Sequence, residues 1–276
     1  MRLATSILLF SLFTSVPLYA QRTRVRANTS DWLEDCRDHS GHWGNDDERA
    51  RHCEVRRSAV RAGSGTITID AGPNGAISVV GGDVDSVIVV AKITAQAETD
   101  SVAAELARGI SIDVSPTSMR SRGPSTHRRR SWWVSFDVTV PRKSALSAET
   151  TNGPISLEGL AGRVEARAVN GPLSVYDMSG DVTGRTQNGP ITAELRGTKW
   201  EGRGLDLETQ NGPVTLRIAD GYNAHLETGT VNGPMRFDFP VTVQGRISKQ
   251  LSVDLGSGGA TIRAVTTNGP VTVRRM

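Results

Sequence analysis

The tripeptide Asn-Gly-Pro occurs six times in the second half of this chain of 276 residues. The intervals between successive asparagines are 18, 18, 23, 21 and 36 residues. A fixed period of about 20 residues is typical of solenoids, in which each repeat stacks on its neighbours. Because the last interval is twice the first, we expect one further copy near Gln250 that has lost the tripeptide. The six asparagines are Asn152, Asn170, Asn188, Asn211, Asn232 and Asn268.

Apolar and polar residues alternate on both sides of every tripeptide. The sixth residue before each asparagine is aliphatic, and the third and fifth residues after it are apolar. The second residue before it is threonine in five copies and alanine in one. Alternation with a period of two predicts half-buried strands, so each unit reads as strand, corner, strand and turn. The asparagine shares the parity of the aliphatic and threonine columns, which predicts that its side chain faces inward.

Each residue of the tripeptide has a physical use at a corner. Glycine supplies a backbone conformation that other residues resist. Proline fixes φ and has no backbone N–H that would have to be paired. Asparagine tolerates the left-handed region, and its amide can bond the next copy. If the copies stack as parallel strands about 4.8 Å apart, the inward asparagines form a ladder. An antiparallel meander or sandwich is the alternative, but proline directly after Asn-Gly removes a donor at the strand start.

The predicted fold is all-β: a parallel β-solenoid or β-helix with coils of about 18–23 residues, preceded by an irregular β section with one short helix. The 29 glycines of the chain favour turns and short strands over long helices. Strand patterns cover residues 66–70, 76–80, 84–93, 110–114 and 133–140, and residues 99–108 read as a helix capped by Asp100 or Ser101. This section should cover the open end of the first coil. The predicted division is a signal peptide at 1–20, a cysteine-containing extension at 21–62, the β section and cap at 63–143, and the repeat solenoid at 144–276.

The N-terminus has the pattern of a secretory signal. Arg2 is followed by an apolar run at residues 7–13, and Ala20 precedes the expected cut before Gln21. The apolar run is too short to span a bilayer, and no second run follows it. We therefore expect an exported protein, periplasmic or extracellular, with no transmembrane segment in the mature chain. A formal net charge of +3 over this length is weak, so nucleic acid is not an expected partner.

Two cysteines, Cys36 and Cys53, lie close together in the sequence. In an exported chain an even number of cysteines favours a disulfide. Zinc binding with His39, His42 and His52 is the alternative, although the spacing matches no standard zinc template. We expect the disulfide and no metal. A short helix or hairpin is expected around the first cysteine, because Asp31 and Glu34 are spaced like an N-cap and its partner.

The order of these features resembles a known family. The segments "GAISVVG" at residues 75–81 and "VSFDVTVP" at residues 134–141 precede repeated "TxNGP" units. This arrangement is similar to the bacterial putative adhesin family, also described as the domain of unknown function DUF4097, from Gly63 to the C-terminus. The segment around Cys36 and Cys53 is similar to the N-terminal extension of some exported members. The resemblance implies a β-helix-like solenoid without established catalytic residues.

The sequence contains none of the common enzyme signatures, such as H-E-x-x-H, G-x-S-x-G or a Walker loop, and no cofactor is expected. Outward carboxylates could still form an acid/base pair of the kind found in carbohydrate-active enzymes. The favoured interpretation is a solvated face, because arginines are interspersed among these carboxylates. The carboxylates are Glu165, Asp206, Glu208 and Glu227, and the arginines are Arg167, Arg185 and Arg263.

The basic segment "MRSRGPSTHRRRSWW" at residues 119–133 is the leading candidate for a binding site. Arginines beside aromatic side chains suit phosphate, anionic glycans or lipid headgroups. The alternative is an insertion whose arginines are merely solvated. His127 and His225 each stand alone and are expected to be surface histidines rather than ligands. The candidate binding residues are Arg120, Arg122, Arg128, Arg129, Arg130, Trp132 and Trp133.

We therefore expect a non-enzymatic, exported module of the cell envelope that binds or supports other components and is a candidate adhesin. The first alternative is a carbohydrate-active enzyme on the same scaffold. The second is an accessory protein that binds anionic envelope polymers through the basic segment. The expected partners are accordingly an anionic glycan or the envelope surface.

Overall fold

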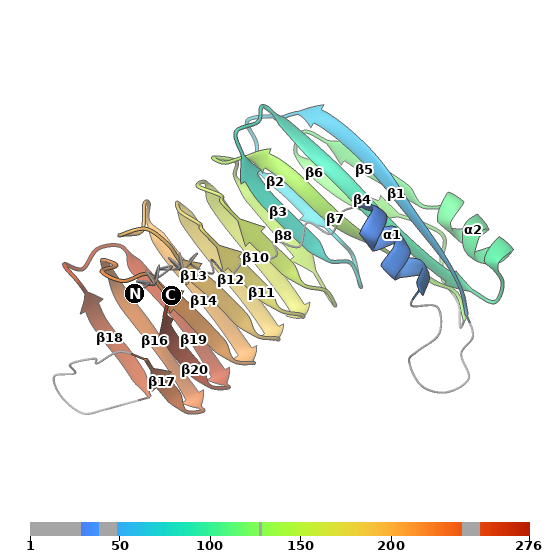
Figure 1. The fold of residues 1–276 in the computed structure, drawn as a ribbon. Helices are drawn as coiled ribbons and strands as arrows, with labels where there is room; N and C mark the ends of the chain where they lie inside the picture. The colour runs from blue at the N-terminus through green and yellow to red at the C-terminus, as the bar shows by residue number, and fades with distance from the viewer. Residues whose placement is uncertain (1–28, 39–48, 127–128, 239–248) are drawn as a thin grey trace, which may run out of the picture.

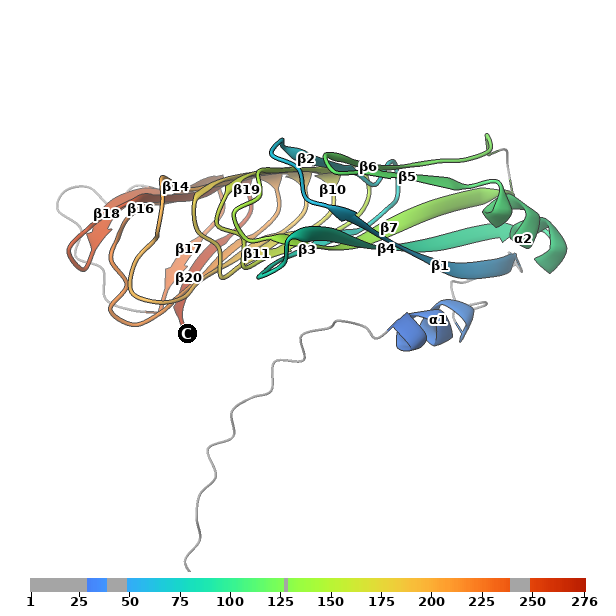
Figure 2. The same ribbon diagram turned by 90° about the horizontal axis from the view of Figure 1, so that it is seen from above.

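The computed structural model describes residues 29–38, 49–126, 129–238 and 249–276. This part of the chain is all-β apart from two short helices, α1 (Thr29–Asp38) and α2 (Asp100–Arg108). Two mostly parallel sheets of ten strands each form two layers with the apolar core between them (Figure 2). Within these residues no helix is long and apolar enough to cross a membrane. The predicted signal peptide, together with His39 and His42, lies outside the described residues.

The strands of the two sheets follow one another along the long axis of the molecule (Figure 1). In spatial order, sheet A contains β1 (Ala50–Arg61), β4 (Ser86–Ala97), β7 (Ser131–Pro141), β3 (Ile77–Gly82), β9 (Ile155–Glu158), β11 (Leu173–Tyr176), β13 (Ile191–Leu195), β15 (Val214–Ile218), β20 (Val271–Arg275) and β17 (Met235–Phe237). Sheet B contains β18 (Gln250–Leu255), β16 (Ala224–Asn232), β19 (Thr261–Asn268), β14 (Gly204–Asn211), β12 (Asp181–Asn188), β10 (Arg163–Asn170), β8 (Leu146–Thr150), β2 (Ile67–Asp70), β6 (Ser118–Arg122) and β5 (Ser111–Ser115).

Each Asn-Gly-Pro corner joins a strand of sheet B to the next strand of sheet A. We call one such strand, its corner and the strand that follows a coil. Neighbouring coils are parallel and in register, so that Asn170 lies beside Asn188 and Asn188 beside Asn211. The predicted parallel stacking of like residues is confirmed by this pairing.

The aliphatic column that precedes each corner lies inside the molecule. Its six side chains, Leu146, Val164, Val182, Leu205, Leu226 and Ile262, are each 1% exposed or less. Burial of one such side chain stabilises the fold by about 1.5–3 kcal/mol relative to leaving it in water. The column therefore explains why the repeat forms a stack, because a single coil could not bury its own apolar face.

Glycine is needed at the corner for a reason that differs from our prediction. None of the tripeptide glycines is among those with positive φ, so their backbone conformation is not a special one. Instead, a Cβ added to Gly171 would lie 2.1 Å from the carbonyl oxygen of Gly153. The other five corners show the same approach, at 2.0–2.2 Å. Only glycine lets the corners stack this closely.

Threonine hydroxyls bind the carbonyls of these glycines from inside the molecule. Thr186 donates to the carbonyl of Gly171 and Thr209 to that of Gly189, both at 2.9 Å. Thr230 and Thr266 likewise donate to the carbonyls of Gly269 and Gly212 in the adjacent corners, and Thr150 donates to that of Gly75, which precedes the first coil. Ala168 occupies this position in the remaining coil and has no hydroxyl to offer. The threonine column therefore binds corner carbonyls that point toward the core.

The asparagine side chains form one row along the outside of the corners. Each amide nitrogen donates to the amide oxygen of its neighbour, at 2.8 Å between Asn170 and Asn152 and likewise along the stack. Asn152 extends the row to Asn74, at 3.1 Å. These asparagines are exposed, so the prediction that they face inward is wrong. The chain turns at the corner, and the parity of the incoming strand ends before the asparagine.

The last coils do not stack in sequence order. Strand β19, which contains Asn268, lies between β14 and β16, so the sixth tripeptide is inserted between the fourth and the fifth. The residues near Gln250 form β18, which pairs antiparallel with β16 at the edge of sheet B. The predicted extra copy near Gln250 is therefore wrong, because this segment covers the last coil instead of extending the stack.

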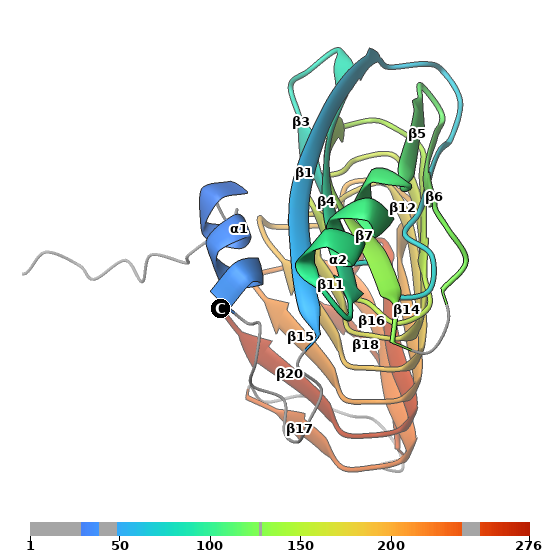
Figure 3. The same cartoon turned by 90° about the vertical axis from the view of Figure 1, so that its right-hand side faces the viewer.

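The N-terminal end is built from longer and less regular elements. Strands β1, β4 and β7 pair antiparallel, and α2 lies across the end of the stack between the two layers (Figure 3). Thr99 caps this helix by accepting from the amide of Val102, and not Asp100 or Ser101 as predicted. Helix α1 begins at Thr29, so Asp31 lies in its first turn and is not an N-cap. The predicted disulfide between Cys36 and Cys53 is confirmed and joins α1 to β1.

Candidate functional site

The basic segment begins on the outer face of sheet B. Arg120 and Arg122 are exposed on β6. Met119 of the same strand points between the two sheets and is fully buried. Arg122 forms an ion pair with Asp113 of β5 at 3.1 Å. Arg120 pairs in register with Asp70 and Asp113 but forms no ion pair within the described part of the chain. A shallow groove of about 490 Å³ lies along this face of β5 and β6.

The two tryptophans of this segment point to opposite faces of sheet A. They are consecutive residues of β7, and consecutive side chains of a strand alternate. Trp132 packs against the core, lies against Gly123, and donates from its indole nitrogen to the carbonyl of Pro124 at 2.9 Å. Trp132 therefore holds the segment that follows β6, and the two rings cannot form one aromatic platform.

Arg129 and Arg130 of this segment lie near the end of β4. Arg130 binds Glu98 at 3.2 Å. The pKa of Glu98 is lowered, first by a backbone hydrogen bond to its carboxylate and then by the hydrogen bond and charge of Arg130 and the charge of Arg129, which together outweigh the opposing effect of desolvation. Arg128 lies outside the described residues. The structure thus divides the predicted site between the outer face of sheet B and the end of sheet A.

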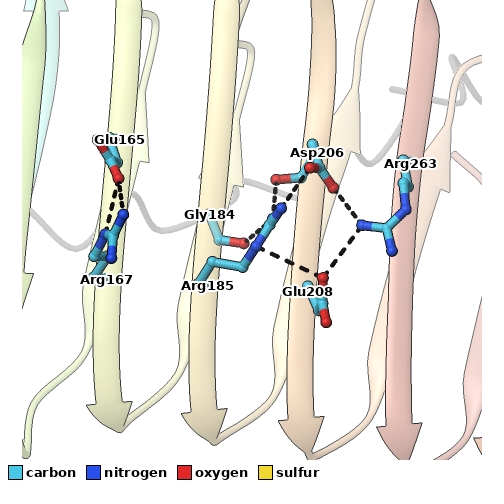
Figure 4. A network of polar contacts seen from close by, with 7 residues as sticks. All are labelled: Glu165, Arg167, Gly184, Arg185, Asp206, Glu208 and Arg263. Atoms are coloured by element: carbon cyan, nitrogen blue, oxygen red, sulfur yellow. Dashed lines mark hydrogen bonds and ion pairs between the residues drawn. The ribbon is translucent and has the colours of Figure 1, made fainter.

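The outer face of sheet B carries a row of charged side chains in strand order. Neighbouring strands contribute, in succession, Asp113, Arg120, Asp70, Glu149, Arg167, Arg185 and Glu208. Beside this row, Glu165 accepts from Arg167 at 2.8 Å on the same strand (Figure 4). On the coils, Glu149, Arg167, Arg185 and Glu208 balance one another in register, so this part of the face presents little net charge.

Asp206 and Glu208 hold the densest part of this network (Figure 4). Asp206 accepts from Arg185 at 2.5 Å and from Arg263 at 2.7 Å, so it lies between two guanidinium groups. Glu208 lies 3.3 Å from Arg263 and 3.7 Å from Arg185. Asp206 and Glu208 are therefore each shared between strands and neutralised by arginine.

The protonation of this network disfavours acid/base catalysis. Desolvation is the largest single effect on Asp206 and raises its pKa, but the hydrogen bonds and charges of Arg185 and Arg263 outweigh it and lower the pKa overall. A carboxyl with a lowered pKa stays ionised and is a poor general acid. Glu165 lies on β10 and Asp206 on β14, with β12 between them. Asp206 is therefore poorly suited to the role of the protonated acid in glycoside hydrolysis.

A second polar cluster lies at the edge of sheet B and was missed from the sequence. The Nδ1 of His225 lies 2.7 Å from Oδ1 of Asp254, and its Nε2 lies 3.0 Å from Oγ of Ser252. Glu227 approaches the same Nε2 at 3.6 Å. The only available signal was the alternation His225-x-Glu227 and Ser252-x-Asp254, which places each pair on one face of its strand. The antiparallel pairing that unites the two strands has no sequence signature.

A metal site receives no support from the described residues, where no three His, Cys, Asp or Glu side chains are arranged so that they could hold a metal ion. Cys36 and Cys53 bind each other, so neither thiolate is available for zinc. His52 instead lies 3.8 Å from Glu54 on the same strand.

No protein-family model and no curated protein sequence matches this chain. Among solved structures, it is similar to a putative cell adhesion protein from Clostridium sporogenes ATCC 15579, with 8% identity, a TM-score of 0.40, and coverage of 82% of this chain and 100% of the other. A putative adhesin from Bacteroides fragilis NCTC 9343 gives 14% identity, a TM-score of 0.34, and coverage of 81% and 97%. A putative lipid binding protein from Parabacteroides distasonis ATCC 8503 gives 10% identity, a TM-score of 0.31, and coverage of 80% and 96%. Such loose likenesses identify no function.

Proposed function

We propose that this protein is an exported β-solenoid of the cell envelope that acts by binding or as a structural support, with adhesion as one form of that role. Its location is periplasmic or extracellular. The disulfide between Cys36 and Cys53 supports export, because such bonds persist in oxidising compartments. The in-register coils support a stiff scaffold, since each coil is bonded to its neighbours through its corner as well as its strands.

One observation carries the choice of binding surface: charge is balanced along the coils but not in the basic segment. The carboxylates of the sheet B network bind arginines, whereas the basic segment, residues 119–133, contains five arginines and no acidic residue. Asp113 and Glu98 bind two of these arginines from outside that segment. Exposed arginines in excess of carboxylates attract phosphate and carboxylate groups. We therefore propose anionic envelope polymers as the ligand class, bound at the end of the molecule that carries β5, β6 and α2.

The binding proposal is tested by removing charge at this end and elsewhere. We compare Arg120→Gln combined with Arg122→Gln against a control pair, Arg203→Gln with Arg236→Gln, which removes the same charge from exposed positions on the coils. Retention on immobilised heparin and co-sedimentation with envelope fractions are measured at low and high salt. Binding through exposed charges should weaken with salt. The first pair should lose most of the salt-sensitive binding and the control pair should keep it, whereas equal losses would contradict the proposal.

The export proposal has its own test. The full chain is expressed in a bacterial host, and the N-terminus and the thiol content of the product are determined by mass spectrometry. We expect a chain that begins at Gln21, is found outside the cytoplasm, and has Cys36 and Cys53 oxidised. An uncleaved cytoplasmic product with free thiols would contradict it.

A further inference from the structure

The cluster at the edge of sheet B has the connectivity of a nucleophile, a base and an orienting carboxylate. Strands β16 and β18 pair antiparallel, which places His225 opposite Asp254 and Glu227 opposite Ser252. Ser252 is thereby diagonal to His225 on the same outer face. The two hydrogen bonds of the imidazole, at 2.7 Å to Asp254 and 3.0 Å to Ser252, fall within the range that such catalytic groups require.

The donors and acceptors of this chain of bonds assign the tautomer of His225. An ionised carboxylate can only accept, so Nδ1 must carry the proton that is donated to Asp254. In the neutral imidazole, Nε2 is then an acceptor, and the hydroxyl of Ser252 donates to it. This is the arrangement in which a histidine removes the proton of a serine as the serine attacks.

Ser252 also lines a groove of about 550 Å³ on the outer face of sheet B. Gly229 and Val265 contribute little bulk to its lining, and Glu208, Glu227 and Arg263 supply polar groups. Such groups can bond the hydroxyls of a polar alcohol. The groove is open and has no apolar tunnel among its lining residues, so it suits a short acyl group rather than a long one.

From these observations we propose that Ser252, His225 and Asp254 form an esterase site for short acyl esters of polyhydroxyl compounds, of which O-acetylated sugars are the simplest class. This activity goes beyond the proposed binding role. It also departs from the expectation that the chain is not an enzyme. The proposal does not use the carboxylates of the charge network as acid or base, so it is separate from the glycosidase alternative.

The reaction balances with water as the only co-reactant. Oγ of Ser252 attacks the ester carbonyl while its proton passes to Nε2 of His225, and the resulting imidazolium is stabilised by Asp254. Collapse of the tetrahedral intermediate breaks the bond to the alcohol, which leaves with the proton from Nε2. A water molecule then attacks the acyl-serine, gives its proton to the same nitrogen, and releases the carboxylic acid as the proton returns to Ser252.

The charged groups around His225 come from three strands. Asp254 of β18 and Glu227 of β16 face the imidazole, and Arg263 of β19 pairs in register with Glu227. The alternative to catalysis is a His225 that merely joins β16 to β18 through these carboxylates. In that case Ser252 would be no more reactive than other surface serines.

Labelling with a fluorophosphonate probe tests the nucleophile directly. The purified chain is incubated with the probe, and the modified peptide is identified by mass spectrometry. We expect modification of Ser252 that is absent in Ser252→Ala and falls about 100-fold in His225→Gln, as loss of a general base predicts. Absence of label on Ser252, or equal labelling in His225→Gln, would overturn the proposal.

Matched controls separate catalysis from folding. Ser147→Ala removes a hydroxyl from the outer face of β8, and His52→Gln removes a histidine that lies beside Glu54. Both should label Ser252 as the unmodified chain does. Acetate release from p-nitrophenyl acetate and from an O-acetylated polysaccharide is then measured for each variant whose unfolding midpoint is unchanged. Release that persists in Ser252→Ala would also overturn the proposal, whereas loss in both Ser252→Ala and His225→Gln, with release kept in the two control variants, supports it.

Discussion

The coils and the N-terminal end of the molecule must both pack against a neighbour and pair their backbone polar groups, but they do so in different ways. A coil is stabilised by its likeness to its neighbours, because glycine stacks on glycine, asparagine bonds asparagine, and threonine binds the carbonyl of the adjacent corner. The N-terminal end has no like neighbour on its outer side. It uses one-off contacts there: a disulfide, a capped helix, and long antiparallel strands.

The contacts of α2 show that a non-repeating element needs a separate partner for each of its ends. Thr99 caps the first turn of the helix, and Arg56 of β1 donates to the carbonyls of Ala107 and Ile110 at its other end. Each unpaired backbone group of the helix needs its own partner from elsewhere in the sequence. The coils do not need separate partners of this kind, because the same tripeptide supplies the same contacts at every corner. Substitutions should therefore be costly at the corner and milder at most positions of the N-terminal section.

The largest expected effect follows from filling the space above a corner glycine. Gly171→Ala places a Cβ 2.1 Å from the carbonyl oxygen of Gly153, which belongs to the backbone and cannot move aside. We expect a loss of about 3 kcal/mol or more in the free energy of unfolding, measured by urea denaturation.

Gly82→Ala in β3 is the matched control for this comparison. Its added Cβ would lie 3.4 Å from a methyl group of Thr139, an ordinary contact. We expect a change of less than about 0.5 kcal/mol. If both glycines tolerate alanine equally, close stacking of the corners is not what makes the tripeptide necessary.

The second effect concerns the covalent link at the N-terminal end. Cys36→Ser combined with Cys53→Ser opens a loop with a sequence separation of 17 residues. The chain-entropy model gives a loss of about 3 kcal/mol for a loop of this length. Thermal unfolding of the variant should match that of the unmodified protein after reduction. Reduction should lower the stability of a coil variant such as Gly171→Ala by the same amount as it lowers that of the unmodified protein. The two effects are independent because the disulfide and the coil corners are far apart in the fold.

The third prediction removes a single hydroxyl from inside a coil. Thr209 is fully buried and donates to the carbonyl of Gly189 at 2.9 Å. Thr209→Val keeps the shape of the side chain but leaves that carbonyl without its partner, which should cost about 1–2 kcal/mol. Thr183→Val, on the outer face of β12, is the control and should change stability by less than about 0.5 kcal/mol. A similar loss in both variants would mean that valine is disfavoured for another reason.

The fourth prediction makes the irregular coil like its neighbours. Ala168 lies in register with Thr150 and Thr186, so threonine at this position should reach the carbonyl of Gly153. Ala168→Thr is expected to raise the free energy of unfolding by about 1 kcal/mol. Urea denaturation beside Thr209→Val measures the same bond gained in one coil and lost in another. Destabilisation by Ala168→Thr would show that this coil has adapted its packing to alanine.

The coil could be predicted from the sequence because its information repeats. The six aligned copies show the same alternation of apolar and polar residues. Leu146 and its five counterparts therefore identify the buried face without any knowledge of contacts. The same likeness hides the order of the coils. Strand β19 fits between β14 and β16 as well as it would beyond β16, because every coil presents the same corner. Nothing local to residues 261–268 distinguishes these positions.

The candidate sites depend on information that does not repeat. The basic segment was recognised from its composition, but the assignment of Trp132 and Trp133 to opposite faces required the register of β7. The cluster of Ser252, His225 and Asp254 depends on an antiparallel strand that occurs at the edge of the stack. Periodicity cannot predict such a pairing, because edges are where a repeat ends.

The smallest expected effect concerns the charge network on the outer face of sheet B. The pKa of Asp206 in the folded protein lies below its usual value of 3.8, despite desolvation, because Arg185 and Arg263 bind the carboxylate. The folded state therefore binds this proton less tightly than the unfolded chain does. The resulting stabilisation is present above the unfolded pKa and is lost as the pH falls through the lower folded pKa. The side chain is 39% exposed, so solvent screening limits the gain to a few tenths of a kcal/mol.

Asp206→Asn should accordingly be slightly less stable than the unmodified protein at pH 7, and the difference should shrink as the pH falls below about 4. Salt at about 1 M should shrink it as well, because exposed ion pairs are screened. Asp83→Asn removes a carboxylate that is 90% exposed and bound by one arginine, and it should show no resolvable difference at any pH. Unfolding midpoints of the three proteins across pH 3–7 provide the comparison. A difference for Asp206→Asn that stays constant down to pH 3 would mean that packing, and not charge, is what the carboxylate contributes to this face.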